Sequence, residues 1–392
     1  MKETLLVNWD SYPNFASGGV YTWEKALIEQ MPDWNFSVVN LLSNSNSNQD
    51  YTLPPNVKNV IELPIYGSTR YEEYYNDTSN LFSKLVRTRD GVVKKRFLPI
   101  FNRFLGSALS ANCDPATLCQ QVFELHTFFG YYDSKKCMEH PATWEAFVKY
   151  IREDAVYKNM SFRSAASAFQ MIQRNIQLLS IEVPPTDIIH CSLAWLPSLV
   201  GIFGKMENNC PMIVTEHGVA FRELLMYSSS NLRDEPSKLF SKVFSENVVR
   251  AVYHSADFIA PVCNANANWE QMIGADQEKI RVIYNGVDTR KFRPQPSLKT
   301  QREPIVVYVG RIDPFKDILC LISAIKEVKK QLPSLTCLIF GAAIDLEYSI
   351  RCAKAVKESD LSTTVRFMGP IKQPEQAYNL GDIVVSSSIT EG

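Results

Sequence analysis

Short apolar runs alternate with stretches of helical spacing along most of the chain. In residues 21–31, Trp23, Ala26 and Leu27 recur at the spacing of one helix face, so this stretch predicts a helix after the first apolar run. Strands that alternate with helices in this way indicate a doubly wound parallel sheet. The predicted strands of this part are 4–8, 36–42, 60–63, 187–190, 211–215, 258–262 and 280–283.

A second alternation of the same kind begins after a polar linker. Its predicted strands are 305–309, 335–340, 364–367 and 382–386. The pattern therefore predicts two Rossmann-like α/β domains, an N-terminal one over 1–298 and a C-terminal one over 299–392. The second ends on a loop after only about 90 residues, whereas about 100–150 residues is the norm. We therefore expect a truncated second domain with one face of its sheet uncovered.

Residues 66–180 interrupt the alternation. Aromatic and charged residues dominate this region, the spacing is helical in 81–86, 144–151 and 165–179, and no strand pattern is visible. We interpret it as a mostly helical insertion in the first domain. Packing, acceptor binding and partner contact are alternative roles for it.

Composition narrows the class of protein. The 392 residues carry a net charge of −1, so no global field draws the chain to nucleic acid or acidic lipid. The nine cysteines form no Cys-x-x-Cys pair and several lie in apolar runs, which predicts buried free thiols and a reducing compartment. The longest apolar region, 193–203, is too short to span a bilayer and contains Pro197. We expect a soluble cytoplasmic protein.

Two cations mark the start of the second domain. Arg311 and Lys316 lie five residues apart in the turn between the strand 305–309 and the next predicted helix. A helix N-terminus flanked by cations is typical of a phosphate site. Fixed cations would also stabilise a diphosphate that leaves during group transfer. A surface charge pair is the alternative interpretation.

Other candidate residues follow the ends of predicted strands, where ligands collect in open α/β sheets. Glu216, His217 and Gly218 follow the strand 211–215, and for His217 a structural role is as plausible as a functional one. His190 also ends a strand, but an apolar helix follows it directly, which favours a structural role. Glu391 follows the last strand and can accept hydrogen bonds from sugar hydroxyls.

Gly18 and Gly19 lie between the first strand and the first helix. They would let the backbone approach a ligand closely, and a plain tight turn is the alternative. The dinucleotide fingerprint Gly-x-Gly-x-x-Gly is absent, which argues against a nicotinamide or flavin enzyme. No Asp-x-Asp pair, His/Cys cluster, phosphate-binding Gly-x-x-x-x-Gly-Lys or Gly-x-Ser-x-Gly elbow occurs either, so a metal-dependent phosphate site and a serine hydrolase are not supported.

Taken together, these motifs resemble glycosyltransferase family 4, a family of retaining enzymes with the two-domain GT-B fold. The resemblance covers nearly the whole chain apart from 66–180. Within the family, residues 12–23 and 215–223 are similar to PelF-type enzymes, which use a uridine-diphosphate (UDP) sugar to build an extracellular polysaccharide from the cytoplasmic side. The matching segments are Gly18–Val20, Glu216–Gly218, Asn285–Asp288 with Phe292, Gly310–Arg311 with Lys316, and Ser387–Gly392.

The resemblance implies a role for each candidate residue. His217 and Glu391 would be catalytic contacts with the donor sugar. Residues that would bind the donor diphosphate are Gly18, Gly19, Arg311 and Lys316. Residues that would contact the sugar or the acceptor are Glu216, Arg222 and Asn285. The second glutamate of the family's Glu-x7-Glu motif would fall beyond residue 392, so the chain as given could be too short to be active.

The implied reaction is a retaining, metal-independent transfer of a hexose from a UDP sugar such as UDP-glucose to a glycan or lipid-linked acceptor. The donor would bind in the cleft between the domains, and domain closure would exclude water. The resemblance also implies peripheral association with a membrane complex for polysaccharide synthesis, at the inner face of the membrane. No nucleic-acid partner is expected.

Two alternatives remain at this point. A non-catalytic nucleotide-sugar-binding or scaffold protein of the same fold would bind the donor without transferring or hydrolysing it. A sugar epimerase of the GT-B fold would epimerise the donor without an acceptor, but no carboxylate cluster supports it.

Overall fold

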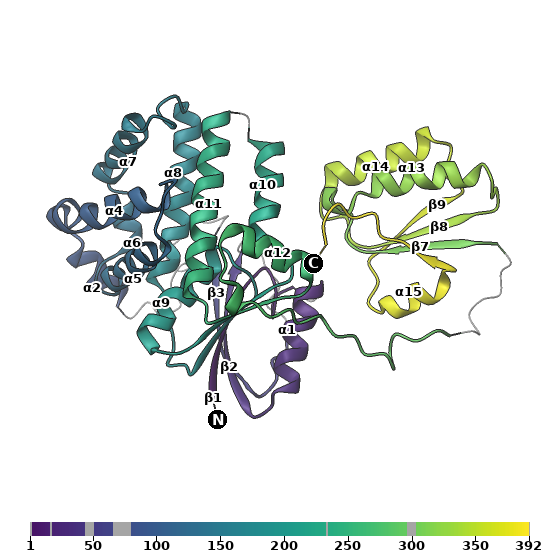
Figure 1. Cartoon of the computed structure of the whole chain (residues 1–392), viewed down its shortest axis with the longest axis horizontal. Coiled ribbons are helices and arrows are strands. Elements are labelled where there is room, and N and C mark those ends of the chain that lie inside the picture. The colour runs from purple at the N-terminus through teal and green to yellow at the C-terminus, as the bar shows by residue number, and fades with distance from the viewer. Residues whose placement is uncertain are drawn as a thin grey trace. The chain divides into compact units, whose positions relative to one another are not determined.

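The computed structural model describes residues 2–15, 18–43, 51–65, 80–232, 234–295 and 303–391. The chain divides into two compact units, Met1–Asn285 and Gly286–Glu391, and each contains one sheet (Figure 1). The predicted domain boundary after residue 298 lies outside the described residues. So do residues 66–79 of the predicted insertion and Gly392.

The first unit is built on a six-stranded parallel sheet in the order β3-β2-β1-β4-β5-β6. Its strand order reverses between β1 and β4, which makes a topological switch point at the carboxyl ends of these strands. The predicted run 280–283 adds only an isolated bridge, between Ile259 and Ile280. The strands are β1 (Lys2–Trp9), β2 (Trp34–Leu42), β3 (Val57–Pro64), β4 (Ile188–Cys191), β5 (Met212–Glu216) and β6 (Phe258–Pro261).

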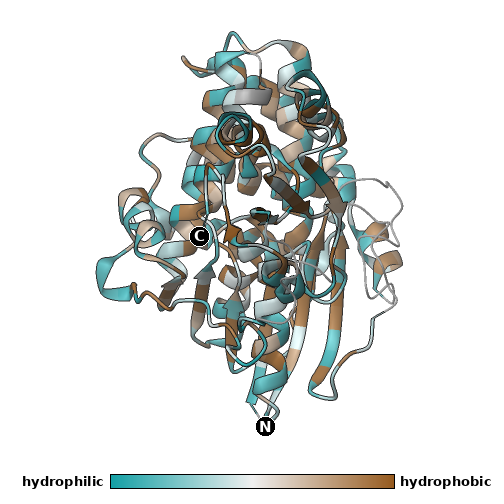
Figure 2. Cartoon of the chain, turned by 90° about the vertical axis from the view of Figure 1, so that its right-hand side faces the viewer, coloured by the Kyte–Doolittle hydropathy of each residue, from teal (hydrophilic) through white to brown (hydrophobic). Residues whose placement is uncertain are grey.

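Both faces of this sheet are covered. Successive residues of a strand point to opposite faces, so Leu6 packs against Ile28 of α1, while Leu5 and Val7 belong to the core formed with α9 and the insertion. The long strands in Figure 2 are accordingly largely brown, the colour of hydrophobic residues. The helices of this part are α1 (Gly19–Gln30), α9 (Leu199–Asn208), α10 (Ala220–Asn231), α11 (Glu235–Ser255) and α12 (Asn264–Ile273).

The described residues of the insertion form helices joined by turns, with no strand among them, so the insertion is mostly helical as the sequence predicts. Phe97, Phe101, Phe129 and Phe147 are fully buried and join it to the core of the first unit. The elements are α2 (Leu81–Arg87), α3 (Asp90–Val92), the π-helical turn η2 (Val93–Phe97), α4 (Leu98–Ala108), α5 (Pro115–Tyr131), α6 (Ser134–Met138), α7 (Pro141–Glu153), α8 (Phe162–Gln177) and the 3-10 turn η3 (Leu178–Ser180).

The second unit has a four-stranded parallel sheet in the order β10-β7-β8-β9. Helices α13 and α14 pack on one face, and α15 packs on part of the other. Apolar side chains of the edge strands β9 and β10 are exposed: Phe367, Met368, Ile383 and Val384. The predicted truncation of this unit stays a prediction. The elements are β7 (Ile305–Val309), α13 (Ile318–Lys329), β8 (Thr336–Phe340), α14 (Leu346–Glu358), β9 (Val365–Gly369), α15 (Pro374–Leu380) and β10 (Ile383–Val384).

All nine cysteines are free and most are buried, as the sequence predicts. Within the described residues, no helix has both the length and the hydrophobicity needed to cross a bilayer.

Candidate functional site

In the first unit, an aromatic cluster forms beside the topological switch point. Trp23, in the second turn of α1, has its ring centroid 5.3 Å from that of His190 and 4.7 Å from that of His217, in edge-on arrangements. His190 is the third of the four residues of β4 and His217 follows β5, so parallel neighbouring strands bring the two histidines toward one edge of the sheet. Sequence reasoning placed His217 here but overlooked Trp23 as a site residue.

Both histidines are held as neutral imidazoles. Burial lowers the pKa of His217 to about 4, and burial together with the neighbouring histidine lowers that of His190 to about 4. His190 Nε2 lies 2.8 Å from Thr215 Oγ1, which gives it a structural partner. Among the described residues, the buried Nε2 of His217 has no hydrogen-bond partner. A polar atom of this kind at the end of a strand is available to a ligand.

Asn285 supports the same histidine from the end of the first unit. Its Nδ2 lies 3.5 Å from His217 Nδ1, at the long limit of a hydrogen bond. If this amide donates to Nδ1, the imidazole proton is on Nε2, which then becomes a donor. Arg222 lies in the first turn of α10, close behind the histidine in sequence. The direct contacts of Asn285 and Arg222 with sugar or acceptor stay predictions.

Glu216 lies beneath His217 and points into the core. Its carboxylate accepts hydrogen bonds from Tyr253 Oη (2.6 Å) and the backbone nitrogen of Ala194 (3.1 Å). The side chain of Glu270 on α12 faces it, and both carboxyl groups are fully buried. The contact of Glu216 with sugar or acceptor stays a prediction, and its observed neighbours are those of a structural residue.

Two buried carboxylates in contact cannot both be charged. Among the described residues, neither oxygen of Glu270 receives a hydrogen bond from a donor group. Burial and the facing Glu216 raise the pKa of Glu270, and burial also raises that of Glu216. We therefore infer that the pair holds one proton in the folded chain, beside the turn that carries His217.

A second buried carboxylate fixes the loop between β1 and α1. Glu24 accepts hydrogen bonds from Asn8 Nδ2, the Ser11 hydroxyl and the backbone nitrogen of Tyr12. Burial raises its pKa to about 7, although these hydrogen bonds oppose the shift. The loop leads to Gly18, whose φ of 108° favours glycine. A Cβ on Gly18 or Gly19 would meet open space, so the backbone at the start of α1 is accessible to a ligand.

In the second unit, the turn after β7 depends on two glycines. A Cβ on Gly341, at the end of β8, would lie 1.7 Å from the carbonyl oxygen of Gly310. The two backbones therefore touch, and no larger residue fits at Gly341 without moving them. This contact fixes the direction in which the chain leaves β7 toward Arg311, and sequence reasoning did not identify it.

The structure brings Arg311, Lys316 and Glu391 of the second unit to one edge of its sheet. Lys316 Nζ lies 2.6 Å from a carboxylate oxygen of Glu391, and its side chain is only 18% exposed. Arg311 Nε lies 3.2 Å from Asp313 Oδ2, and its side chain is 61% exposed. Ser387 Oγ also donates to the carbonyl of Lys316, which docks the last loop on the turn. Each cation therefore already has a carboxylate partner.

The helix after this turn begins at Ile318. Its N-cap is Asp317, in the left-handed conformation (φ 43°), and the Asp317 carboxylate accepts a hydrogen bond from the backbone nitrogen of Cys320. One of the free N–H groups at the helix start is thus already satisfied. A diphosphate at this turn would rely mainly on Arg311 and Lys316.

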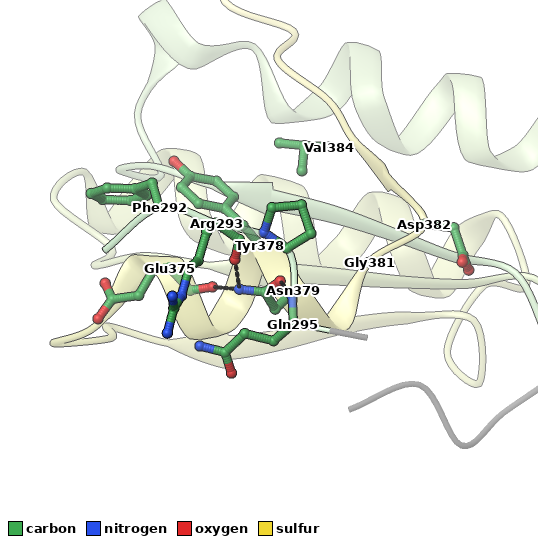
Figure 3. A pocket seen from close by; sticks show the side chains of 10 residues that line it. Phe292, Arg293, Gln295, Glu375, Tyr378, Asn379, Gly381, Asp382 and Val384 are labelled. Carbon is green, nitrogen blue, oxygen red and sulfur yellow. Dashed lines mark hydrogen bonds between the residues drawn. The ribbon is translucent and has the colours of Figure 1, made fainter. Parts of the chain in front are cut away.

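A pocket of about 650 Å³ lies elsewhere in the second unit, between segment 292–295 and α15 (Figure 3). Asn379 joins its walls, because its amide accepts a hydrogen bond from the nitrogen of Gln295 and donates one to the carbonyl of Arg293. Phe292 packs on Tyr378 at the same place. None of the predicted site residues lines this pocket, so we do not assign it to the candidate site.

Within the described parts of the chain, no group of three or more His, Cys, Asp or Glu side chains is placed to hold a metal ion. Metal independence of the reaction stays a prediction.

The fold is that of a protein with two α/β units, each built on a parallel sheet. The chain belongs to the family described as a domain of unknown function (DUF3492), whose model matches residues 3–278. Residues 289–392 match the family described as glycosyl transferases group 1.

The chain is also similar to curated D-inositol 3-phosphate glycosyltransferases. It is 26% identical to that of Nocardia farcinica over 220 residues, which are 52% of this chain and 47% of the relative. It is 25% identical to that of Kribbella flavida over 223 residues, which are 52% of this chain and 50% of that relative. The chain spans about half the length of these relatives.

Two solved structures confirm the predicted fold class. Sucrose-phosphate synthase of Thermosynechococcus elongatus has a TM-score of 0.56 and 19% identity, and the match covers 100% of this chain and 76% of that one. HepE of Anabaena in complex with UDP-glucose has a TM-score of 0.53 and 13% identity, and the match covers 100% of this chain and 75% of HepE. At these identities the likeness concerns the fold alone.

Proposed function

We propose that this chain is a retaining glycosyltransferase of the GT-B class. It transfers a hexose from a UDP sugar, without a metal, to a glycan or lipid-linked acceptor in polysaccharide biosynthesis at the cytoplasmic face of a membrane. The observation that carries the proposal is the convergence of Arg311, Lys316 and Glu391 at one turn. This turn lies in the residues that match glycosyl transferases group 1.

In the second unit, Arg311 and Lys316 bind the donor diphosphate. The guanidinium can hold two oxygens, and the ammonium adds a point charge. Because Asp313 and Glu391 occupy these cations in the structure, diphosphate binding exchanges one set of anionic partners for another. Glu391, released from Lys316, becomes free to accept hydrogen bonds from sugar hydroxyls.

In the first unit, His217 contacts the donor sugar and the backbone at Gly18 and Gly19 approaches the diphosphate. A neutral imidazole with its proton on Nε2 donates a hydrogen bond without adding a charge near the reacting carbon. In the transfer step, the bond from the anomeric carbon to the diphosphate oxygen breaks and a bond to the acceptor oxygen forms on the same face. The acceptor proton passes to the departing diphosphate, whose growing charge the two cations stabilise.

A donor-hydrolysis assay tests the proposal without knowledge of the acceptor. The chain is incubated with UDP-glucose, and released UDP is measured for wild type, Arg311→Ala and a matched control, Arg351→Ala. Arg351 is an exposed arginine on α14 of the same unit and is not among the candidate site residues. We expect slow release of UDP that Arg311→Ala abolishes and Arg351→Ala leaves unchanged.

Thermal shifts with UDP, ADP and GDP separate binding from catalysis. A nucleotide at 100 times its dissociation constant should add about 2.7 kcal/mol to the free energy of unfolding. A shift with UDP that Arg311→Ala removes, but without UDP release, would favour a nucleotide-sugar-binding protein that is not an enzyme. Equal shifts in wild type and Arg311→Ala would refute the assignment of the diphosphate site.

A further inference from the structure

The helical insertion carries a local excess of positive charge. Residues 81–103 contain seven Lys or Arg residues and one acidic residue, Asp90, although the chain as a whole has a net charge of −1. Of the seven, only Lys84 is buried. The positive charge is therefore concentrated in one stretch of the chain rather than spread over the whole molecule.

Three of these side chains are free to meet an external anion. Among the described residues, Arg87, Arg89 and Lys95 have no ion pair or side-chain hydrogen bond. Two others belong to the same stretch but already have neighbours: Lys94 pairs with Asp90 at 2.9 Å, and Arg96 contacts the hydroxyl and the ring of Tyr132.

Apolar side chains are exposed beside this charge. Phe82 is 77% exposed and Val86 50% exposed, and their i,i+4 spacing places them on one face of α2. Lys84 and Thr88, on the opposite side of this stretch, are buried. Thr88 Oγ1 accepts a hydrogen bond from the backbone nitrogen of Asp133, and Lys136 Nζ donates one to the carbonyl of Leu85. In Figure 1, α2 lies at the outer edge of the insertion.

Another helix shows that exposed apolar residues alone do not make such a surface. Helix α14 exposes Leu346 and Ile350 at the same spacing. Its stretch 345–360, however, carries three basic and four acidic residues, a net charge of −1. Helix α14 therefore lacks the positive charge that accompanies the exposed apolar side chains of α2.

We propose that the surface formed by Phe82, Val86, Arg87, Arg89 and Lys95 docks the chain onto an anionic lipid membrane. Basic side chains are attracted to acidic headgroups, while an exposed aromatic and an aliphatic residue enter the boundary of the acyl chains. Nucleic acid would leave these apolar side chains in water. The proposal gives the insertion a role that does not depend on the transferase activity.

Co-sedimentation with vesicles tests it, with phosphatidylcholine alone and phosphatidylcholine mixed with phosphatidylglycerol at low and high salt. We expect binding to the anionic vesicles only, weakened by salt. Arg87→Gln, Arg89→Gln and Lys95→Gln together should weaken it about a hundredfold, since each basic residue near such a surface contributes about fivefold. Phe82→Ser should weaken it about tenfold or more without changing its salt dependence.

The matched control has the same loss of charge elsewhere: Arg351→Gln, Lys354→Gln and Lys357→Gln on α14. It should bind anionic vesicles like wild type. Absence of wild-type binding to anionic vesicles would overturn the proposal and leave an acidic protein as the partner of this surface. Equal weakening by the two triple variants would also overturn it, because binding would then follow total charge. UDP release is measured in parallel and should not change, which separates this test from that of the transferase.

Discussion

The proton shared by Glu216 and Glu270 makes a specific prediction about stability. Between the ordinary glutamate pKa of about 4.3 and the raised pKa of the pair, the folded chain holds one proton that the unfolded chain has lost. The free energy of unfolding must therefore fall as pH rises through this window. The stability that this proton contributes is fully present below the ordinary glutamate pKa. Between the ordinary and the raised pKa it declines by about 1.4 kcal/mol per pH unit.

Glu270→Gln should remove this dependence. Glutamine can donate a hydrogen bond to Glu216 but has no proton to lose in this range. The difference in the free energy of unfolding between the variant and wild type should then grow in favour of the variant, by about 2.7 kcal/mol from pH 6.5 to pH 8.5. For a unit of this size, that corresponds to a relative shift in melting temperature of about 5–10 °C.

Melting curves over this pH range provide the assay, with Glu153→Gln as the control. Glu153 is an exposed residue of α7 whose side chain is 68% exposed. Its variant should follow wild type at every pH. Parallel curves for Glu270→Gln and wild type would refute the shared proton. Glu270→Ala should be less stable than Glu270→Gln at every pH, because it leaves Glu216 without this donor and opens a cavity.

Three further predictions concern the candidate site. The Glu391→Gln variant should bind UDP up to about fivefold more tightly than wild type. The reason is that the ion pair between Glu391 and Lys316, worth at most about 1 kcal/mol, no longer competes with the diphosphate for Lys316. A fluorescence titration with UDP measures the two dissociation constants. Gly341→Ala should lower the melting temperature of the second unit, since its Cβ would overlap the carbonyl of Gly310; an unchanged melting temperature would contradict this contact. Trp23→Ala should slow UDP release more than Trp23→Phe, which keeps an aromatic ring against the site histidines.

The sequence predicts much of the architecture because the apolar runs are local signals. A run such as 305–309, buried on both faces, is read directly from consecutive residues. The residues at strand ends could also be predicted, because parallel strands bring them to one edge. Arg311, Lys316 and Glu391 meet in the structure for this reason.

The partners of these residues could not be predicted in the same way. Glu216 meets Tyr253 and Glu270 across 37 and 54 positions of sequence, and no local spacing marks such a contact. Glu24 reads as an ordinary polar residue of a helix, yet it is fully buried beneath a loop. The proximity of Trp23 to the two histidines depends in the same way on how α1 packs on the sheet.

The central position of β1 has a consequence for how the chain is made. Its second neighbour in the sheet is β4, and Thr4 pairs with Ile188. The chain passes through about 120 residues between β3 and β4, so a ribosome at about 5–20 residues per second needs about 6–24 s to supply the missing strand. During this interval β1 has an open edge, and pairing across so long a separation is slow. Because the insertion is rich in local helical contacts, we expect it to fold first and to bring β4 close to the unpaired edge of β1.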